Sequence, residues 1–277
     1  MDYTDKFVLL ASKHHKEQAI EPIFRQNLGC NLCVEDIDTD QFGTFTGEIP
    51  RTLSAYETCI LKAKYAANEK KYALSVASEG SFGPHPSNPF IALAHEIMVF
   101  VDLENDWQIV EQLRTPNTNY KMMTINKDTL LTPFLKSALF SSHALTLQSA
   151  DEKDIIAKGI NTPHQLEASL SDGFKKHPNL LIATDMRAMM NPTRMQTIGE
   201  LAEKLSIRIK SLCSGCGAPG FGFKSVNGHL PCRLCGENTT MYQYEKWGCI
   251  QCDYQEQRSR KDHLIVADPS HCDYCNP

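Results

Sequence analysis

Four Cys-x-x-Cys pairs in the C-terminal part of the chain constrain its fold more than any other feature. Such a pair forms a tight turn that directs two thiolates at one metal ion, and two pairs complete a tetrahedral zinc site with four cysteine ligands. Eight cysteines therefore predict two structural Zn²⁺ ions. The predicted ligands are Cys213, Cys216, Cys232, Cys235, Cys249, Cys252, Cys272 and Cys275.

The four pairs can combine in a nested, a sequential or an interleaved way. The spacer between Cys235 and Cys249 contains Met241, Tyr242 and Tyr244, which is typical of a zinc-ribbon hairpin. We therefore expect the nested pairing, in which the inner four cysteines bind one ion and the outer four bind the other. The sequential and interleaved pairings remain open at this point.

Residues 211–277 form the predicted zinc-ribbon module. They contain too few apolar residues for a core of their own, so we expect the metal ions to hold the module folded. Acidic side chains outnumber basic ones in this segment, which disfavours nucleic acid as a partner. Because sulfur fills every predicted ligand position, no position is left open for catalysis. A structural role or the docking of a protein partner is the expected function of the module.

Residues 1–210 are numerous enough for one sizeable α/β domain. Apolar, β-prone runs alternate with helical patterns along this segment. This alternation predicts an α/β fold with a mixed or mostly parallel sheet and helices on both of its faces. The expected strands lie at residues 7–11, 31–37, 72–79, 96–102, 144–148 and 179–184, and the expected helices at 15–27, 54–68, 132–140, 162–170 and 191–210.

The composition is ordinary for a soluble globular protein, with 42% hydrophobic and 22% charged residues. A net charge of −5 disfavours general binding to nucleic acid or to an anionic membrane. No apolar stretch approaches the length of a membrane span, and the first residues lack the apolar core of a signal peptide. We expect a cytoplasmic protein, in which the cysteines are metal ligands or reduced thiols.

The segment Tyr72–Pro86 changes from an apolar strand into Glu79 and a turn rich in glycine and proline. Sheets of this class bind ligands at the carboxyl ends of their strands, so Glu79 is expected at a binding site. The turns after other strands contribute further polar residues, and the polar loop Asp38–Arg51 is expected to close over the ligand. The substrate-binding candidates are Ser12, His14, Lys16, Asp40, Arg51, Ser81, His85, Asp185 and Arg187.

The catalytic candidates are Glu57, Lys62 and Glu79. Two carboxylates from neighbouring elements could hold Mg²⁺ between the protein and a substrate phosphate, and Lys62 would offset negative charge. In the simpler interpretation, Glu57 forms a capping box with Ser54 at the start of its helix. Asp185 and Arg187 likewise have two interpretations, because they can clamp an anion or form an internal salt bridge.

Four stretches together resemble a bacterial family known as domain of unknown function 6671. They are DTDQFGTFTGEIPR, ASEGSFGPHP, TDMRAMMNPTRM and ADPSHCDYCNP. The resemblance covers nearly the whole chain, but it implies no activity.

Residues 7–102 are also similar to the inosine/xanthosine triphosphate pyrophosphatases. The similarity lies in Ala11–Lys16, Glu57–Ala63 and Ser78–Ser81, although His14 stands where that family has asparagine. It implies that Glu57 and Glu79 bind Mg²⁺ and that Lys62 contacts phosphates. The leading hypothesis is therefore a Mg²⁺-dependent phosphohydrolase acting on a nucleotide or related phosphate ester. The alternative is a non-enzymatic ligand-binding or protein-docking adaptor that uses the zinc module.

Overall fold

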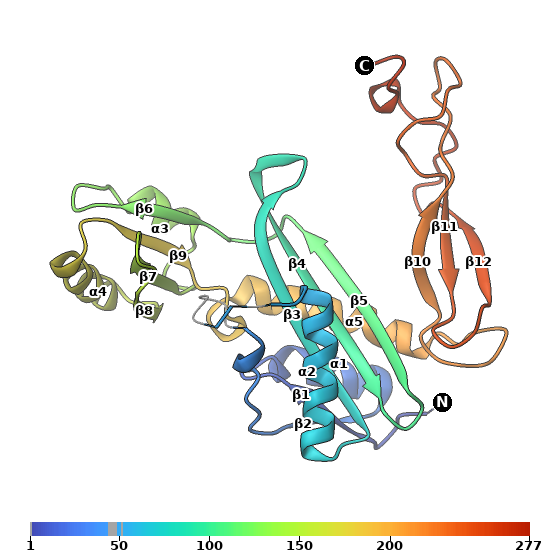
Figure 1. Cartoon of the computed structure of the whole chain (residues 1–277), viewed down its shortest axis with the longest axis horizontal. Coiled ribbons are helices and arrows are strands. Elements are labelled where there is room, and N and C mark those ends of the chain that lie inside the picture. Colours follow the sequence, from blue (N-terminus) through green and yellow to red (C-terminus); the bar gives the residue numbers. More distant parts are fainter. Residues whose placement is uncertain (1, 44–48, 51) are drawn as a thin grey trace. The chain divides into compact units, whose positions relative to one another are not determined.

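Apolar strands from the first 115 residues build a five-stranded mixed sheet in a computed structural model, which describes residues 2–43, 49–50 and 52–277 (Figure 1). β1 lies between β2 and β3 and is parallel to both, whereas β3, β4 and β5 pair antiparallel. Short hairpins join the last three strands, so no helix is needed between them. The strands are β1 (Phe7–Ala11), β2 (Asn31–Val34), β3 (Leu74–His85), β4 (Asn88–Asp102) and β5 (Trp107–Thr115).

Helices cover both faces of this sheet. Alternate strand residues point to opposite faces, and Leu9, Ala77 and Val99 pack with α2 (Ala55–Lys70) on one face. α1 (Glu17–Leu28) lies on the other face, and the first part of α5 (Pro192–Lys210) packs against it (Figure 1). α1 ends at Gly29, which has a left-handed backbone conformation that glycine adopts readily.

A second, four-stranded sheet forms from residues 122–184 in the order β6-β9-β7-β8. All of its neighbouring strands are antiparallel, and Leu145, Leu147 and Ile182 belong to its core. Two helices, α3 (Thr132–Ser137) and α4 (Pro163–Lys176), supply Phe134 and Leu166 to the same core. The strands are β6 (Met122–Ile125), β7 (Leu145–Ser149), β8 (Ile155–Ile160) and β9 (Leu180–Thr184).

The mixed α/β class predicted from the sequence is confirmed, but the expectation of one sheet is wrong. The hairpins β3–β4 and β4–β5 limit the parallel part of the first sheet to β2, β1 and β3. The apolar runs at residues 145–149 and 180–184 pair with each other instead of joining that sheet. Alternating apolar residues indicate a strand but not the strand with which it pairs.

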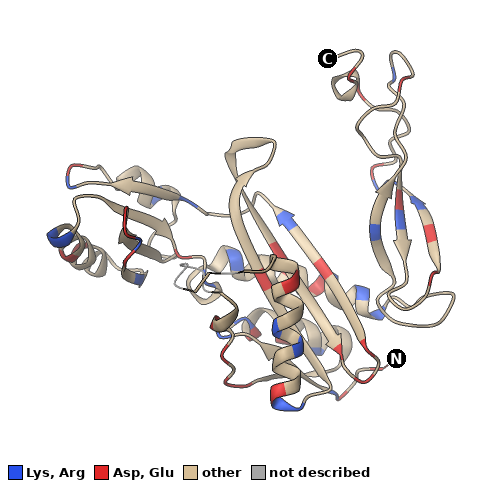
Figure 2. Ribbon diagram, in the orientation of Figure 1, with Lys and Arg blue, Asp and Glu red and all other residues tan. Residues whose placement is uncertain are grey.

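The described residues divide into two units, 2–206 and 207–277. The second unit contains a three-stranded antiparallel sheet in the order β10-β11-β12, with β10 (Gly222–Asn227), β11 (Tyr244–Gly248) and β12 (Gln255–Ser259). Basic and acidic residues both occur along these strands (Figure 2). Throughout the described residues, every helix is too short or too polar to traverse a lipid bilayer.

Candidate functional site

The eight cysteines of the second unit form two groups of four. The sulfur atoms of each group lie within 4.8 Å of one another, so each group can hold one metal ion. The pairing is interleaved, and the nested pairing predicted from the sequence is wrong. One group consists of Cys213, Cys216, Cys249 and Cys252, and the other of Cys232, Cys235, Cys272 and Cys275.

The antiparallel sheet explains the interleaved pairing. Each strand carries the chain from one end of the sheet to the other, so successive connections lie at alternating ends. The first pair precedes β10 and the third lies between β11 and β12, at the same end. The second pair lies between β10 and β11 and the fourth follows β12, at the opposite end.

The sulfur geometry fits a tetrahedral metal site. The Sγ atoms of Cys213 and Cys252 are 3.8 Å apart, and those of Cys235 and Cys272 are 3.6 Å apart. Zinc–sulfur bonds of about 2.3 Å place tetrahedral sulfurs about 3.8 Å from one another. The donor set therefore suits zinc.

A cavity of about 380 Å³ lies in the unit of residues 2–206. Its wall combines the turn after β1, the segment at residues 39–43, the middle of β3 and residues from β8, the β9–α5 connection and α5. Turns after β1 and β9 therefore meet the middle of β3 in one space. Glu79 lies within β3, which continues to His85, so the turn predicted directly after Glu79 is wrong. The polar side chains in the wall are Ser12, Lys13, His14, Lys16, Thr39, Asp40, Lys62, Ser78, Glu79, Ser81, Lys158, Arg187 and Arg194.

Cationic side chains dominate the charged part of this wall. Among the described residues it contains six lysines and arginines but only two acids, Asp40 and Glu79. Lys62 donates to Glu79 with a distance of 2.5 Å, and Lys13 lies 3.5 Å from Asp40. Burial raises the pKa of Glu79, but the charges of Lys62 and Lys16 lower it by a larger amount. The net shift is therefore downward, and the carboxylate is ionised.

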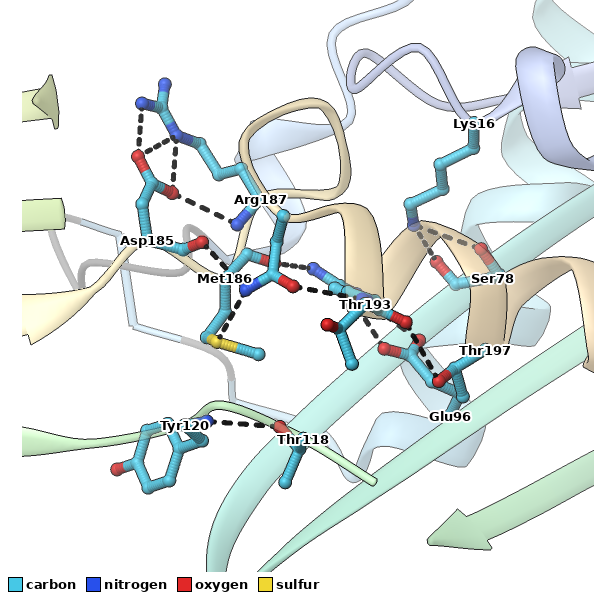
Figure 3. Close-up of polar contacts among 12 residues, drawn as sticks. Lys16, Ser78, Glu96, Thr118, Tyr120, Asp185, Met186, Arg187, Thr193 and Thr197 are labelled. Carbon is cyan, nitrogen blue, oxygen red and sulfur yellow. Dashed lines mark hydrogen bonds and ion pairs between the residues drawn. The ribbon is translucent and has the colours of Figure 1, made fainter. Parts of the chain in front are cut away.

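Asp185 holds Arg187 at the edge of the cavity. Asp185 follows β9, is completely buried and accepts hydrogen bonds from the backbone and side chain of Arg187 (Figure 3). The backbone N–H of Gly159 also donates to its carboxylate, at 3.1 Å. The internal salt bridge considered from the sequence therefore exists. Arg187 lines the cavity, whereas Asp185 lies behind it.

Arg194 occupies the first turn of α5 and connects that helix with β4. Its guanidinium donates to the buried carboxylate of Glu96 at 2.7 Å and to the carbonyl of Met186. It also stacks on the ring of Phe82, 5.0 Å from the ring centroid. Gly80 leaves room for this ion pair, because a Cβ atom at this position would force the side chains of Arg194 and Glu96 to shift.

Lys16 and His14 are the least ordinary ionisable groups of the wall. Lys16 is 5% exposed, and its Nζ donates to the carbonyl oxygen and hydroxyl of Ser78 at 2.8 and 3.0 Å. Burial, reinforced by Arg194, lowers the pKa of Lys16 to about 8. Burial and the charges of Lys16 and Arg194 lower the pKa of His14 to about 4, so this imidazole is neutral at physiological pH.

Eight of the predicted site residues meet in the cavity wall. They are Ser12, His14, Lys16, Asp40, Lys62, Glu79, Ser81 and Arg187.

Three predicted residues lie elsewhere, and a fourth falls outside the described residues. Glu57 forms the capping box of α2 with Ser54 and is absent from the cavity lining, so it does not join Glu79 in a metal-binding pair. His85 lies at the end of β3, outside the lining. Asp185 lies behind Arg187, and Arg51 is outside the described residues.

The predicted set of site residues did not include Lys13, Lys158 or Arg194. Lys13 belongs to the same turn as Ser12 and His14, and Arg194 begins the helix that follows Asp185 and Arg187, so both carried a signal in the sequence. Lys158 lies in β8, which reaches the cavity only through tertiary packing. The sequence around Lys158 therefore does not indicate a place in the site.

Comparisons with known proteins place the chain in a family. No curated protein matches it. A family model described as Domain of unknown function (DUF6671) matches residues 62–277, which include the eight cysteines, Glu79, Arg187 and Arg194. The match does not extend to the turn after β1, and the similarity to triphosphate pyrophosphatases stays a prediction. Because the model covers more than half of the sequence, the chain belongs to the DUF6671 family.

Proposed function

We propose that the cavity of residues 2–206 binds a small phosphate-bearing molecule and that the cysteine groups of the second unit hold two structural zinc ions. The observation that carries the first part is the gathering of six lysine and arginine side chains around one cavity, against two acids, in the part of the wall that the structure describes. Lysine and arginine are the side chains that bind phosphate oxygens most strongly. The cavity volume of about 380 Å³ suits a small ligand.

Acids behind the wall orient its cations. Asp185 fixes Arg187, Glu96 fixes Arg194, and Asp38 accepts from Lys13 at 2.8 Å. A guanidinium held in this way loses little conformational entropy when an anion binds, which favours affinity. Hydroxyl groups of Ser12, Ser78, Ser81 and Thr39 add hydrogen-bonding capacity to the same wall.

This arrangement favours phosphate binding through side-chain cations over binding through Mg²⁺. A magnesium site usually needs one or two carboxylates that face the ligand. In the described part of the wall, Glu79 is bound by Lys62 and Asp40 lies beside Lys13. Hydrolysis with Glu79 as a metal ligand would require that Lys62 first release its carboxylate.

The test is calorimetric titration of the zinc-loaded chain with pyrophosphate and with ADP, each with and without Mg²⁺. We expect binding without Mg²⁺, and a loss of about 10-fold or more in affinity for Arg187→Gln, since a charge-assisted hydrogen bond contributes about 1.5–3 kcal/mol. Lys13→Gln provides a second variant that leaves no buried acid unpaired. Arg25→Gln removes an exposed arginine of α1 outside the cavity and is the matched control.

Absence of binding to any of these anions would contradict the proposal. Binding that depends strictly on Mg²⁺, together with release of phosphate that Glu79→Gln abolishes, would instead support the phosphohydrolase hypothesis. The two results are distinguishable by a chelator that removes Mg²⁺ but is too weak to remove zinc. Phosphate binding through side-chain cations requires that the anions still bind in its presence.

Protein docking through the second unit stays the alternative. Leu234 and Tyr274 lie between the cysteines of two pairs that share one metal site, and they are 74% and 78% exposed. Large exposed apolar side chains near one another are typical of interaction surfaces. The variant Leu234→Ser should keep both metal ions and lose a co-purifying partner, and an unchanged set of co-purifying proteins would count against this role.

A further inference from the structure

The amine of Lys16 is held in an unusual way for a lysine. Its side chain leaves the start of α1 and reaches the backbone of β3, where Nζ is in contact with Ser78 (Figure 3). Within the described part of the chain, Nζ makes two hydrogen bonds, and both acceptors are neutral oxygens of Ser78. The residue is buried but belongs to the lining of the cavity.

The number of acceptors matches a neutral amine. A neutral amine has two N–H groups and one lone pair, whereas an ammonium has three N–H groups and no lone pair. With both N–H groups donating to Ser78, no described residue engages the lone pair of a neutral Lys16. Lys13 and Lys62 differ, because each donates to a carboxylate.

Burial and the charge of Arg194 also favour the neutral amine, whereas the charges of Glu79 and Glu96 favour the ammonium. The net effect lowers the pKa of Lys16 to about 8, and about a tenth of such a group is unprotonated at pH 7. An ordinary lysine at the same pH is almost wholly protonated. Desolvation and a cationic neighbour are the two conditions that make a lysine nucleophilic toward carbonyl compounds.

We propose that Lys16 forms an imine with a ligand that carries an aldehyde or ketone as well as a phosphate. This inference rests on the proposed binding of phosphate, which the cations of the same cavity would hold. The substrate class is thus a small phosphorylated carbonyl compound.

The reaction balances without an oxidant or a reductant. The amine nitrogen attacks the carbonyl carbon, the C–N bond forms, and the carbonyl double bond opens to a carbinolamine. The C–O bond then breaks and the oxygen leaves as water, which carries away the two hydrogens of the amine. The acid that protonates the leaving oxygen recovers its proton when the nitrogen loses its last hydrogen. The imine and one water are therefore the only products.

Pyridoxal 5′-phosphate is a suitable probe because it combines a phosphate with an aldehyde. The zinc-loaded full chain is incubated with it, reduced with borohydride and digested, and mass spectrometry locates the modified lysines. We expect one saturable adduct, on Lys16, that excess pyrophosphate prevents. Lys16→Arg should lose this adduct, and Lys204→Arg, which changes an exposed lysine of α5 outside the cavity, should retain it.

A second measurement uses only the wild-type chain, so it does not require a variant to fold. In the wild-type chain, the rate of modification at Lys16 should level off above a pH of about 8, whereas the rate at exposed lysines should keep rising toward about 10.4. Modification of Lys16 that follows the exposed lysines would overturn the inference.

Pyridoxine 5′-phosphate, which has an alcohol in place of the aldehyde, separates the two proposals. If it binds and pyridoxal 5′-phosphate leaves Lys16 unmodified, the imine is refuted and phosphate binding stands. If neither compound nor pyrophosphate binds, phosphate binding fails, and the imine fails with it.

Discussion

Lys13 and Lys16 belong to one turn and line one cavity, yet their surroundings shift their pKa values in opposite directions. A hydrogen bond to Asp38 raises the pKa of Lys13. Burial lowers the pKa of Lys16 to about 8, and Ser78 offers it neutral oxygens instead of a carboxylate. The chemistry of each lysine therefore depends on what packs around it and not on its position in the sequence.

His14 gives a testable pH dependence at the same scale. Its pKa is about 4 in the folded chain and about 6.5 in the unfolded chain. Between these values the unfolded chain binds a proton that the folded chain does not, so stability falls as the pH is lowered through this window. As the pH is lowered through this window, we expect the free energy of unfolding, measured in urea, to fall less for His14→Gln than for the wild-type chain. Equal slopes for both proteins would contradict the burial of this imidazole.

At the scale of elements, the start of α2 assigns Glu57 a structural role. The Oγ of Ser54 accepts from the backbone N–H of Glu57 at 3.2 Å, and the carboxylate of Glu57 accepts from the backbone N–H of Ser54 at 3.0 Å. These reciprocal bonds satisfy two N–H groups that a helix end leaves without partners. The carboxylate is thereby occupied at the helix terminus.

The cap leads to a prediction that separates stability from binding. Ser54→Ala should lower the free energy of unfolding by about 1 kcal/mol and leave the affinity for pyrophosphate unchanged. Glu57→Gln should have a smaller effect on stability, because glutamine can also accept from the N-cap. Denaturant unfolding and calorimetry measure the two quantities. A large loss of affinity in Glu57→Gln would restore this acid to the binding site.

At the scale of the whole molecule, the interleaved cysteine groups can be tested by counting metal ions. Cys213→Ser with Cys249→Ser removes two ligands from one group, so we expect one ion per chain to remain. Cys213→Ser with Cys272→Ser removes one ligand from each group, so both sites are damaged. Metal content by mass spectrometry reads out each result, and the wild-type chain should hold two ions.

The nested pairing makes the opposite prediction for the same two double variants. It would leave one ion after the loss of Cys213 and Cys272, and damage both sites after the loss of Cys213 and Cys249. The comparison is independent of which ion is bound. Zinc itself is tested by the identity of the metal that co-purifies with the wild-type chain.

Much of the local structure followed from neighbouring residues. Thr162 with Gln165 forms the predicted start of α4, and Asn191 accepts from the backbone N–H of Arg194 at the start of α5. The presence of two metal-binding groups likewise followed from the spacing within each Cys-x-x-Cys pair. These features involve contacts within one turn of chain, which the sequence specifies directly.

The sequence by itself determined where the helices α1 to α5 form, where several strands lie, and that the cysteines assemble in groups of four. It did not predict β5, β6 or β8. Only the tertiary structure decided which strands pair, which cysteine pairs share an ion, and that Lys62 binds Glu79 while Glu96 binds Arg194. The physical reason is the separation of the interacting residues along the chain. A cap or a metal-binding turn is formed by residues a few positions apart, whereas these partners are brought together by the burial of apolar faces far apart in the chain.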